Sequence, residues 1–461
     1  MKTDCTSKQI EFGDVRGRKL VATFNAEHIT SDGGLTLLYK VDRHFGVLKQ
    51  FARCFRDHRD PDLIHHPVEQ LLRQRVFAIA CGHEDLNDHA ALCSDPLLSA
   101  MVGKADPTER LASPSTLNRL ELTPADATAE DRYRKVVYQG EAVADLFVDL
   151  FLDAHKGPPA ELVLDLDATD DPIHGTQEGR FFHGYYGNYC YLPLYIFAGE
   201  YLLCAKLRTS DIDGAAGSLE EVQRIVARIR GRWPKTRLII RGDSGFARDE
   251  LMTWCEENHV HYVLGLARNA RLERMIVRAL ADAKAMSERT GEAARLFREL
   301  RYRTRDSWTR ERRVVAKAEY LGDKANPRFV VTSFSPLEWE AQALYEKLYC
   351  ARGDMENRIK EQQLDLFADR TSAHTMRANQ LRLWFSSFAY VLLNLLRNFG
   401  LRGTEMERAQ AGTIRTKLLK VGAMVRVSVR RVVLSLSAAS PVRELYARIV
   451  AQLAKNAPAP A

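Results

Sequence analysis

The segment ELVLDLDATDD at residues 161–171 constrains the fold more than any other stretch of the sequence. Leucines occupy every second position from Leu162, and the positions between them carry Val163, Asp165 and Asp167. Because successive side chains of a β-strand point to opposite faces, this period of two predicts a strand with one buried face. The other face of the same strand must accommodate carboxylates.

The segments that follow predict a sheet around this strand. A Tyr- and Gly-rich run at 183–208 indicates two or more strands, joined near Gly199. A helix is expected over 218–230, and the short apolar strands TRLIIRGD and HYVLGLAR come after it. A strand meander followed by helix, strand, helix and strand is typical of an α/β fold with a mixed sheet of the ribonuclease-H kind, flanked by helices.

Changes in sequence texture divide the chain into five regions. We expect a mainly helical region, two parts of the ribonuclease-H-like core, the second of them helical, a β-rich insertion that separates these two parts, and a basic C-terminal region. The insertion is expected because the apolar strand HYVLGLA precedes it and RFVVTSF resumes the sheet after it. The predicted boundaries are 1–145 for the helical region, 146–268 and 327–400 for the core, 269–326 for the insertion and 401–461 for the basic region.

Positive charge is concentrated at the C-terminal end. Residues 401–461 hold eleven basic and three acidic residues, a net charge of +8, whereas the whole chain carries +7. A local basic surface of this kind is what phosphate binding requires. A solvated charged face on an ordinary helix or strand has the same composition, so charge alone leaves both interpretations open.

Cysteine usage and hydropathy point to a protein of the cytoplasm. The eight cysteines, from Cys5 to Cys350, form no Cys-x-x-Cys pair, so neither a zinc site nor a disulfide framework is predicted. The first 14 residues lack the apolar run of a signal peptide. The most apolar stretch, 383–396, is shorter than the roughly 20 residues that span a bilayer and predicts a buried helix.

Three acidic residues stand where such a sheet concentrates function. Asp167 lies on the first strand, Asp243 follows the strand LIIRG, and Glu356 falls on a late helix. Carboxylates suit phosphodiester chemistry, because Mg²⁺ prefers oxygen ligands and two ions about 4 Å apart can activate the attacking oxygen and stabilise the leaving one. On strand parity Asp165 points the same way as Asp167, so either could be the first ligand.

These residues lie in motifs that resemble the DDE transposases of bacterial insertion sequences, specifically the insertion-sequence thirteen-eighty family, which is related to the insertion-sequence-four superfamily. The resemblance implies a ribonuclease-H-like core in which Asp167, Asp243 and Glu356 match the catalytic, metal-binding Asp, Asp and Glu. It also implies two Mg²⁺ ions, with Mn²⁺ able to substitute. The motifs are GHEDLNDH (82–89), 164–197, RGDSGFAR (241–248) and YCARGDMENRIKE (349–361).

The same superfamily carries a Tyr-x2-Arg-x3-Glu-x6-Lys signature around its Glu. Tyr349, Arg352 and Glu356 fit it and share one helix face, but Gln363 stands at the Lys position, and Lys360 is the basic residue that could substitute. Tyr349, Arg352 and Lys360 are therefore candidate DNA contacts. For Arg352 a structural salt bridge to Asp354 or Glu356 is the alternative.

The insertion adds one further candidate. Trp308 resembles an aromatic on which a flipped base could stack, although a buried ribbon tryptophan is the alternative. On a regular ribbon its parity turns it inward. We expect the alternating arginines around it to form one face towards DNA; they are Arg301, Arg303, Arg305, Arg310 and Arg312.

The function implied is that of a transposase encoded by a mobile element. It would bind the terminal inverted repeats through its N-terminal region, act as an endonuclease at each DNA end, and join the freed ends to target DNA. The expected partners are double-stranded DNA and a second copy of the chain, with no membrane and no small-molecule cofactor, in the cytoplasm at the nucleoid. A metal-dependent nuclease without strand transfer and a non-catalytic DNA-binding protein are the alternatives.

Overall fold

The computed structural model describes residues 9–25, 28–322 and 324–455, so Cys5, the first eight residues and the last six lie outside the described part. The chain forms two compact units. Unit 1 combines residues up to Leu48, Asp60–Asn118 and the residues from Leu396 onward. Unit 2 combines Lys49–Arg59 with Arg119–Leu395 and contains all the predicted site residues.

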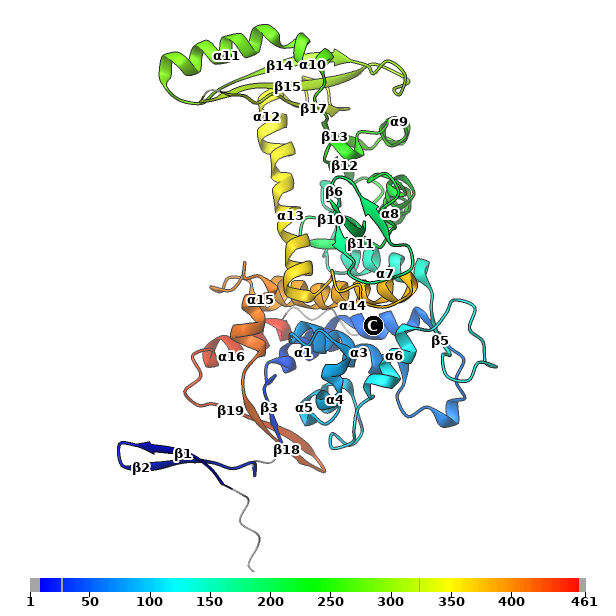
Figure 1. Ribbon diagram of the computed structural model, residues 1–461, viewed down its shortest axis with the longest axis vertical. Coiled ribbons are helices and arrows are strands. Elements are labelled where there is room, and N and C mark those ends of the chain that lie inside the picture. The colour runs from blue at the N-terminus through cyan, green and yellow to red at the C-terminus, as the bar shows by residue number, and fades with distance from the viewer. Residues whose placement is uncertain (1–8, 26–27, 323, 456–461) are drawn as a thin grey trace, which may run out of the picture. The chain divides into compact units, whose positions relative to one another are not determined.

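A mixed sheet organises unit 2 (Figure 1). Its first five strands lie in the order β11, β10, β6, β12, β13. Strand β10 is antiparallel to both β11 and β6, whereas β12 is parallel to β6 and to β13. Numbered along the chain this is the order 3-2-1-4-5 of a ribonuclease-H-like sheet, which confirms the predicted fold class. The bounds are β6 Glu161–Ala168, β10 Leu194–Ala198, β11 Tyr201–Lys206, β12 Arg237–Gly242 and β13 His261–Leu266.

The alternation along β6 places its residues as the sequence predicts. Leu164 and Leu166 are fully buried in a core that also contains residues of α7 (Gly140–Asp153), α8 (Ser218–Arg232) and α9 (Asp249–Glu257). On the opposite face, Ile239 of β12 and Val263 of β13 pack with apolar residues of the helical segment that begins at Ala341. The carboxylates of β6 share this second face.

The inserted segment is continuous with the core sheet. It begins with two helices, α10 (Ala270–Met275) and α11 (Val277–Thr290), and continues as a β-ribbon. Strand β15 pairs with both β14 and β17, and β17 pairs with β13. The ribbon is therefore hydrogen-bonded to the ribonuclease-H-like strands. The insertion strands are β14 Ala294–Tyr302, β15 Arg312–Leu321 and β16 Lys324–Ala325, and β17 Arg328–Thr332 follows the insertion.

The rest of unit 2 consists of helices and of short strands outside the main sheet. Helix α14 (Met376–Leu395) is mostly buried, as its apolar sequence predicts, and its Trp384 Nε1 donates to the carbonyl of Ala205 on β11. No helix of the described residues is long and apolar enough to cross a membrane. The small strands are β4 Phe55–Asp57, β5 Val136–Tyr138, β7 Asp171–Pro172, β8 Phe181–His183 and β9 Asn188–Tyr191.

Unit 1 is helical, with two small sheets. Strands β1 (Ile10–Val15) and β2 (Arg18–Ala22) form an exposed hairpin, and β3 (Ile29–Thr30) joins β18 (Ala423–Ser428) and β19 (Arg431–Leu436). The principal helices are α1 Leu35–Phe45, α3 Val68–Ala80, α5 Pro96–Val102 and α16 Arg443–Lys455, with short helices α4 His89–Leu92 and α15 Ala411–Ile414. Helices α2 Val47–Arg53 and α6 Pro114–Glu121 span residues of both units.

Part of the basic C-terminal segment has a structural role inside unit 1. Arg415 Nε donates to the carbonyl of Ala80 at 3.0 Å, and Lys420 Nζ lies 2.7 Å from Asp32 Oδ1. In contrast, Arg426, Arg430 and Arg431 on and between β18 and β19 are exposed. The basic C-terminal segment thus contains cations that bind other parts of unit 1 and cations that are exposed to solvent.

Candidate active site

Asp165 and Asp167 point to the same face of β6 but have different partners. Asp165 is buried and accepts two hydrogen bonds from the Arg241 guanidinium, at 2.5 and 2.7 Å. Asp167 Oδ1 accepts from Arg352 Nη2 at 3.2 Å. Burial raises the pKa of Asp167 to about 6; Arg352 opposes the shift, and the charges of Asp243 and Glu356 add to it. Asp165 is held in a buried ion pair, and Asp167 faces the other predicted site residues.

Asp243 lies in a tight turn at the end of β12. Its Oδ1 accepts from the Gly245 backbone N–H at 2.8 Å, which caps the short 3₁₀ helix Ser244–Phe246. Gly265 on the neighbouring strand leaves room for the hydroxyl of Tyr349, because a Cβ there would lie 2.6 Å from Tyr349 Oη and 2.9 Å from Ser244 N. Tyr349 therefore packs against the turn that carries Asp243.

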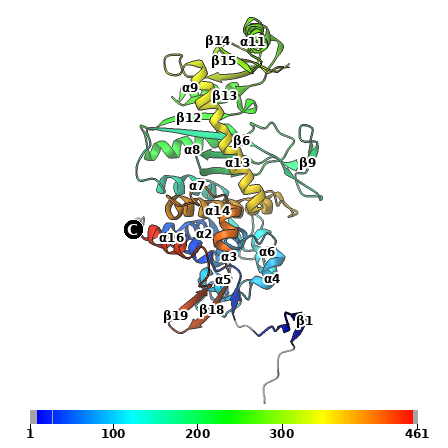
Figure 2. The same ribbon diagram turned by 90° about the vertical axis from the view of Figure 1, so that its left-hand side faces the viewer.

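Glu356 lies on the long helical segment that is labelled α12 and α13 in Figure 1 and that Figure 2 shows from the side. A π-helical turn and a 3₁₀ turn precede α13, and a second π-helical turn follows it. Such π-helical turns are rare and occur often at functional sites. The segment runs through α12 Ala341–Ala343, π Leu344–Tyr349, 3₁₀ Cys350–Arg352, α13 Gly353–Lys360 and π Glu361–Asp365.

The Arg352 guanidinium lies between the carboxylates. Its Nη2 is 3.2 Å from Asp167 Oδ1 and its Nη1 is 3.1 Å from Glu356 Oε1. Burial lowers the pKa of Arg352, but the charges of Asp167, Asp243 and Glu356 outweigh it and raise that pKa overall. Among the described residues, no three His, Cys, Asp or Glu side chains are grouped closely enough to hold a metal ion. The three carboxylates share one electrostatic environment around a guanidinium.

The positions after Glu356 differ in exposure. Lys360 is exposed, one turn beyond Glu356. Gln363, which stands at the Lys position of the signature, donates from Nε2 to Asp171 Oδ1 at 2.9 Å and to the Asp170 carbonyl at 3.2 Å. Asp171 is fully buried, and this burial raises its pKa to about 8. Gln363 thus fastens the end of the Glu356 segment to β7.

Trp308 does not face the carboxylates, which corrects its assignment as a base-stacking residue. The side chain is 4% exposed and packs edge-on against Tyr302, with ring centroids 5.7 Å apart. Arg312, predicted to face DNA, is also buried, with ion pairs to Asp249 and Glu256 at 2.6 and 2.7 Å. Burial leaves neither Trp308 nor Arg312 a surface that DNA could contact.

Two residues near the carboxylates had no predicted role. Arg241 lies inside the quoted RGDSGFAR motif, and Asp171 follows the predicted ligand strand. A buried arginine between two apolar strand residues and four acids within seven residues were the available signals. Neither signal names a partner, because Arg241 and Asp165 are brought together only by the parallel pairing of β6 and β12.

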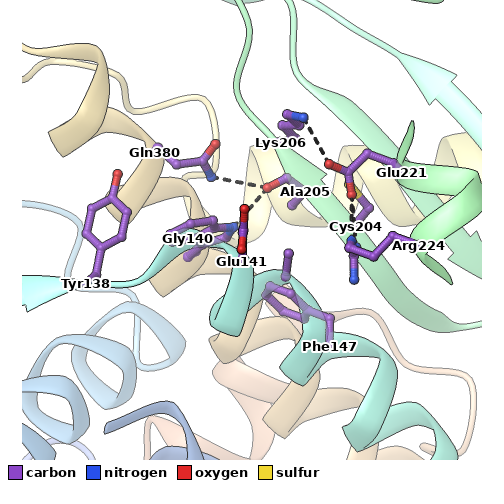
Figure 3. Close-up of a pocket in the computed structure, with 12 residues that line it drawn as sticks. Tyr138, Gly140, Glu141, Phe147, Cys204, Ala205, Lys206, Glu221, Arg224 and Gln380 are labelled. Atoms are coloured by element: carbon purple, nitrogen blue, oxygen red, sulfur yellow. Dashed lines mark hydrogen bonds and ion pairs between the residues drawn. The ribbon is translucent and has the colours of Figure 1, made fainter. Parts of the chain in front are cut away.

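A second hollow of unit 2, of about 340 Å³, contains none of these residues (Figure 3). Its floor is apolar, and three of its charged side chains are paired: Glu221 contacts both Lys206 and Arg224 at 2.9 Å. Gln380 donates to the Ala205 carbonyl at 3.2 Å. Because none of the predicted site residues lines this hollow, we assign it no part in the active site.

Comparison with known proteins identifies the family to which the chain belongs. The family model described as transposase DDE domain group 1 matches residues 12–458. The cryo-EM structure of a piggyBac transposase synaptic complex with hairpin DNA is similar at 12% identity, covering 84% of this chain and 79% of that chain with a TM-score of 0.41. No protein of curated function matches the sequence. Since the family model spans nearly the whole chain, the protein belongs to transposase DDE domain group 1 and is a DDE-type polynucleotidyl transferase.

Proposed function

We propose that the protein is the transposase of a bacterial insertion sequence of the thirteen-eighty family. It binds the terminal inverted repeats of its element, cleaves each DNA end, and joins the freed 3′ ends to target DNA. The observation that carries this proposal is that Asp167 and Glu356 both form ion pairs with the guanidinium of Arg352. The negative charge of Asp243 also helps to raise the pKa of Arg352. Three carboxylates whose charges act on one guanidinium can balance a high positive charge.

The donor set fits divalent metal ions. Asp167, Asp243 and Glu356 offer hard oxygen ligands, which Mg²⁺ prefers, and Mn²⁺ can take the same ligands. Two such ions would activate the attacking oxygen and stabilise the leaving oxygen of an in-line displacement. Asp165 is not proposed as a ligand, because Arg241 already engages both of its carboxylate oxygens.

Positively charged side chains near the carboxylates are proposed to contact the DNA. We assign Arg352 a second role, contact with a phosphate beside the reacting group, because a guanidinium binds phosphate oxygens in pairs. Tyr349 packs against the Asp243 turn, and exposed Lys360 follows on the same helical segment. Both ends of an element must be held together, so we propose a homodimer on double-stranded DNA, acting at the nucleoid without a membrane or a small-molecule cofactor.

Cleavage of a labelled element end in Mg²⁺ tests this proposal. Wild-type protein should cut the end, and Glu356→Gln should not, because one ligand charge is lost. Asp354→Asn is a matched control, since Asp354 is an exposed acid on the same helical segment and should leave cleavage intact. Equal activity of wild type and Glu356→Gln would refute the role of Glu356.

Pre-cut ends separate a transposase from a nuclease. When they are incubated with target DNA, wild-type protein should produce joined strands, and chelation of the metal should prevent joining. Cleavage of intact ends without any joining of pre-cut ends would support the alternative of a metal-dependent nuclease.

A further inference from the structure

A cavity of about 340 Å³ in unit 2 has Asp243 in its wall. One side is formed where β13 ends and β17 begins, which are adjacent because Leu266 pairs with Phe329. Arg268 lies just beyond β13, and Arg328 is the first residue of β17. Tyr345 and Tyr349 of the π-helical turn line the cavity as well. The cavity therefore joins the Asp243 turn to β17, the strand that follows the insertion.

The two arginines of this cavity carry uncompensated charge. Within residues 9–25, 28–322 and 324–455, neither guanidinium has a carboxylate or hydrogen-bond partner in the protein, and both side chains are exposed. The nearby buried arginines differ, since Arg241, Arg312 and Arg313 are all ion-paired. An anionic ligand would supply the missing counter-charge.

The shape and the wall define the ligand further. Guanidinium groups bind phosphate oxygens with charge-assisted pairs of hydrogen bonds. The rings of Tyr345 and Tyr349, with centroids 5.5 Å apart, offer aromatic surface of the kind that packs against nucleic-acid bases. The volume lies at the lower end of the range of roughly 300–1,000 Å³ for small-ligand sites, so the cavity admits one nucleotide and excludes a duplex.

We propose that this cavity is a nucleotide subsite that holds the terminal nucleotide of the DNA strand whose 3′ oxygen reacts. The inference rests on the proposed function. Arg268 and Arg328 bind the phosphate on the 5′ side of that nucleotide, and the two tyrosines pack against its sugar and base. The 3′ end then lies beside Asp243, the residue of the cavity wall that is one of the three proposed metal ligands.

Binding of a mononucleotide to the full-length protein without metal tests the subsite. Deoxyadenosine 5′-monophosphate should bind in a calorimetric titration, whereas deoxyadenosine and inorganic phosphate should bind more weakly. Arg268→Ala and Arg328→Ala should each weaken the nucleotide by about 10-fold or more, because a hydrogen bond to a charged group is lost. Arg289→Ala, which removes an exposed arginine of α11, should leave affinity unchanged. Melting temperatures of the variants show that all are folded.

Two results would overturn the subsite. One is wild-type affinity in the Arg268→Ala/Arg328→Ala double variant, and the other is inorganic phosphate binding as tightly as the nucleotide, which would mean an anion site only. Cleavage of labelled element ends is measured on the same wild-type preparation. If wild-type protein cleaves element ends but the Arg268→Ala/Arg328→Ala variant binds the nucleotide as tightly as wild type, only the subsite is refuted. Arginine-dependent nucleotide binding without cleavage or joining refutes the proposed function and retains the nucleotide site.

Discussion

Asp165 and Asp167 lie two residues apart on one face of a strand, but their ion-pair partners differ. Asp165 neutralises Arg241 in the sheet interior, whereas Asp167 shares Arg352 with Glu356. Strand parity could not distinguish them, because it fixes the face and not the partner. Their partners lie 76 and 185 residues away along the chain.

Isosteric substitution of the two aspartates should give opposite phenotypes. Asp165→Asn leaves the buried Arg241 without its counter-charge and should lower the free energy of unfolding by about 3–5 kcal/mol. Asp167→Asn should keep stability and DNA binding but abolish cleavage. Urea unfolding and cleavage of a labelled end measure the two effects. Full cleavage by Asp167→Asn would assign the first ligand elsewhere.

Asp171 should make stability depend on pH. Its pKa is about 8 in the folded chain against an ordinary value of 3.8, so between these values the folded chain keeps a proton that the unfolded chain releases. Stability from this group is therefore complete below about pH 4 and is lost as pH rises to about 8. Asp171→Asn should gain stability over wild type with rising pH in urea unfolding. A difference that stays constant from pH 4 to 8 would contradict a buried neutral acid.

At the scale of elements, the contact between β13 and the Glu356 segment depends on a missing side chain. Gly265→Ala places a Cβ against Tyr349 Oη and Ser244 N, and should cost about 1–3 kcal/mol of stability and displace the Asp243 turn. Adding Tyr349→Phe should recover part of the loss, because it removes the clashing hydroxyl. Gly157→Ala, with nothing within 4 Å, is the control. Thermal unfolding of wild type, the two single variants, the double variant and the Gly157→Ala control checks the prediction, and an additive double variant would refute it.

The elements also show which features a sequence pattern can predict and which it cannot. The alternation of β6 predicted its buried face because one core cluster covers all its leucines. The insertion was harder, because Arg312 belongs to an alternating set of arginines that reads as an exposed ribbon face but is itself buried. The partners that bury Arg312, Asp249 and Glu256, come from α9. A pattern within one segment cannot report a partner that another segment supplies.

At the scale of the whole molecule, the C-terminal basic segment belongs to the core of unit 1. Removing residues 401–461 would delete α16, whose Ile449 and Leu453 are buried, so truncation would unfold unit 1 rather than test DNA binding. The exposed arginines of the β18–β19 hairpin can be tested alone. Replacing Arg426, Arg430 and Arg431 by Gln should flatten the dependence of DNA affinity on salt, by about one unit of log–log slope per lost contact. An unchanged slope would make them an ordinary solvated surface.

The position of β17 has a consequence for how the protein is made. The five ribonuclease-H-like strands are complete once the ribosome has passed Leu266, but the outer edge of β13 stays unpaired until Arg328–Thr332 emerge. An open edge invites pairing with other chains during this interval. Glu356 and the last part of unit 1 are translated later still. A nascent transposase therefore cannot bring Glu356 to the sheet that carries Asp167 and Asp243 before the insertion has been synthesised, and a chain interrupted within the insertion is released without one of the three proposed metal ligands.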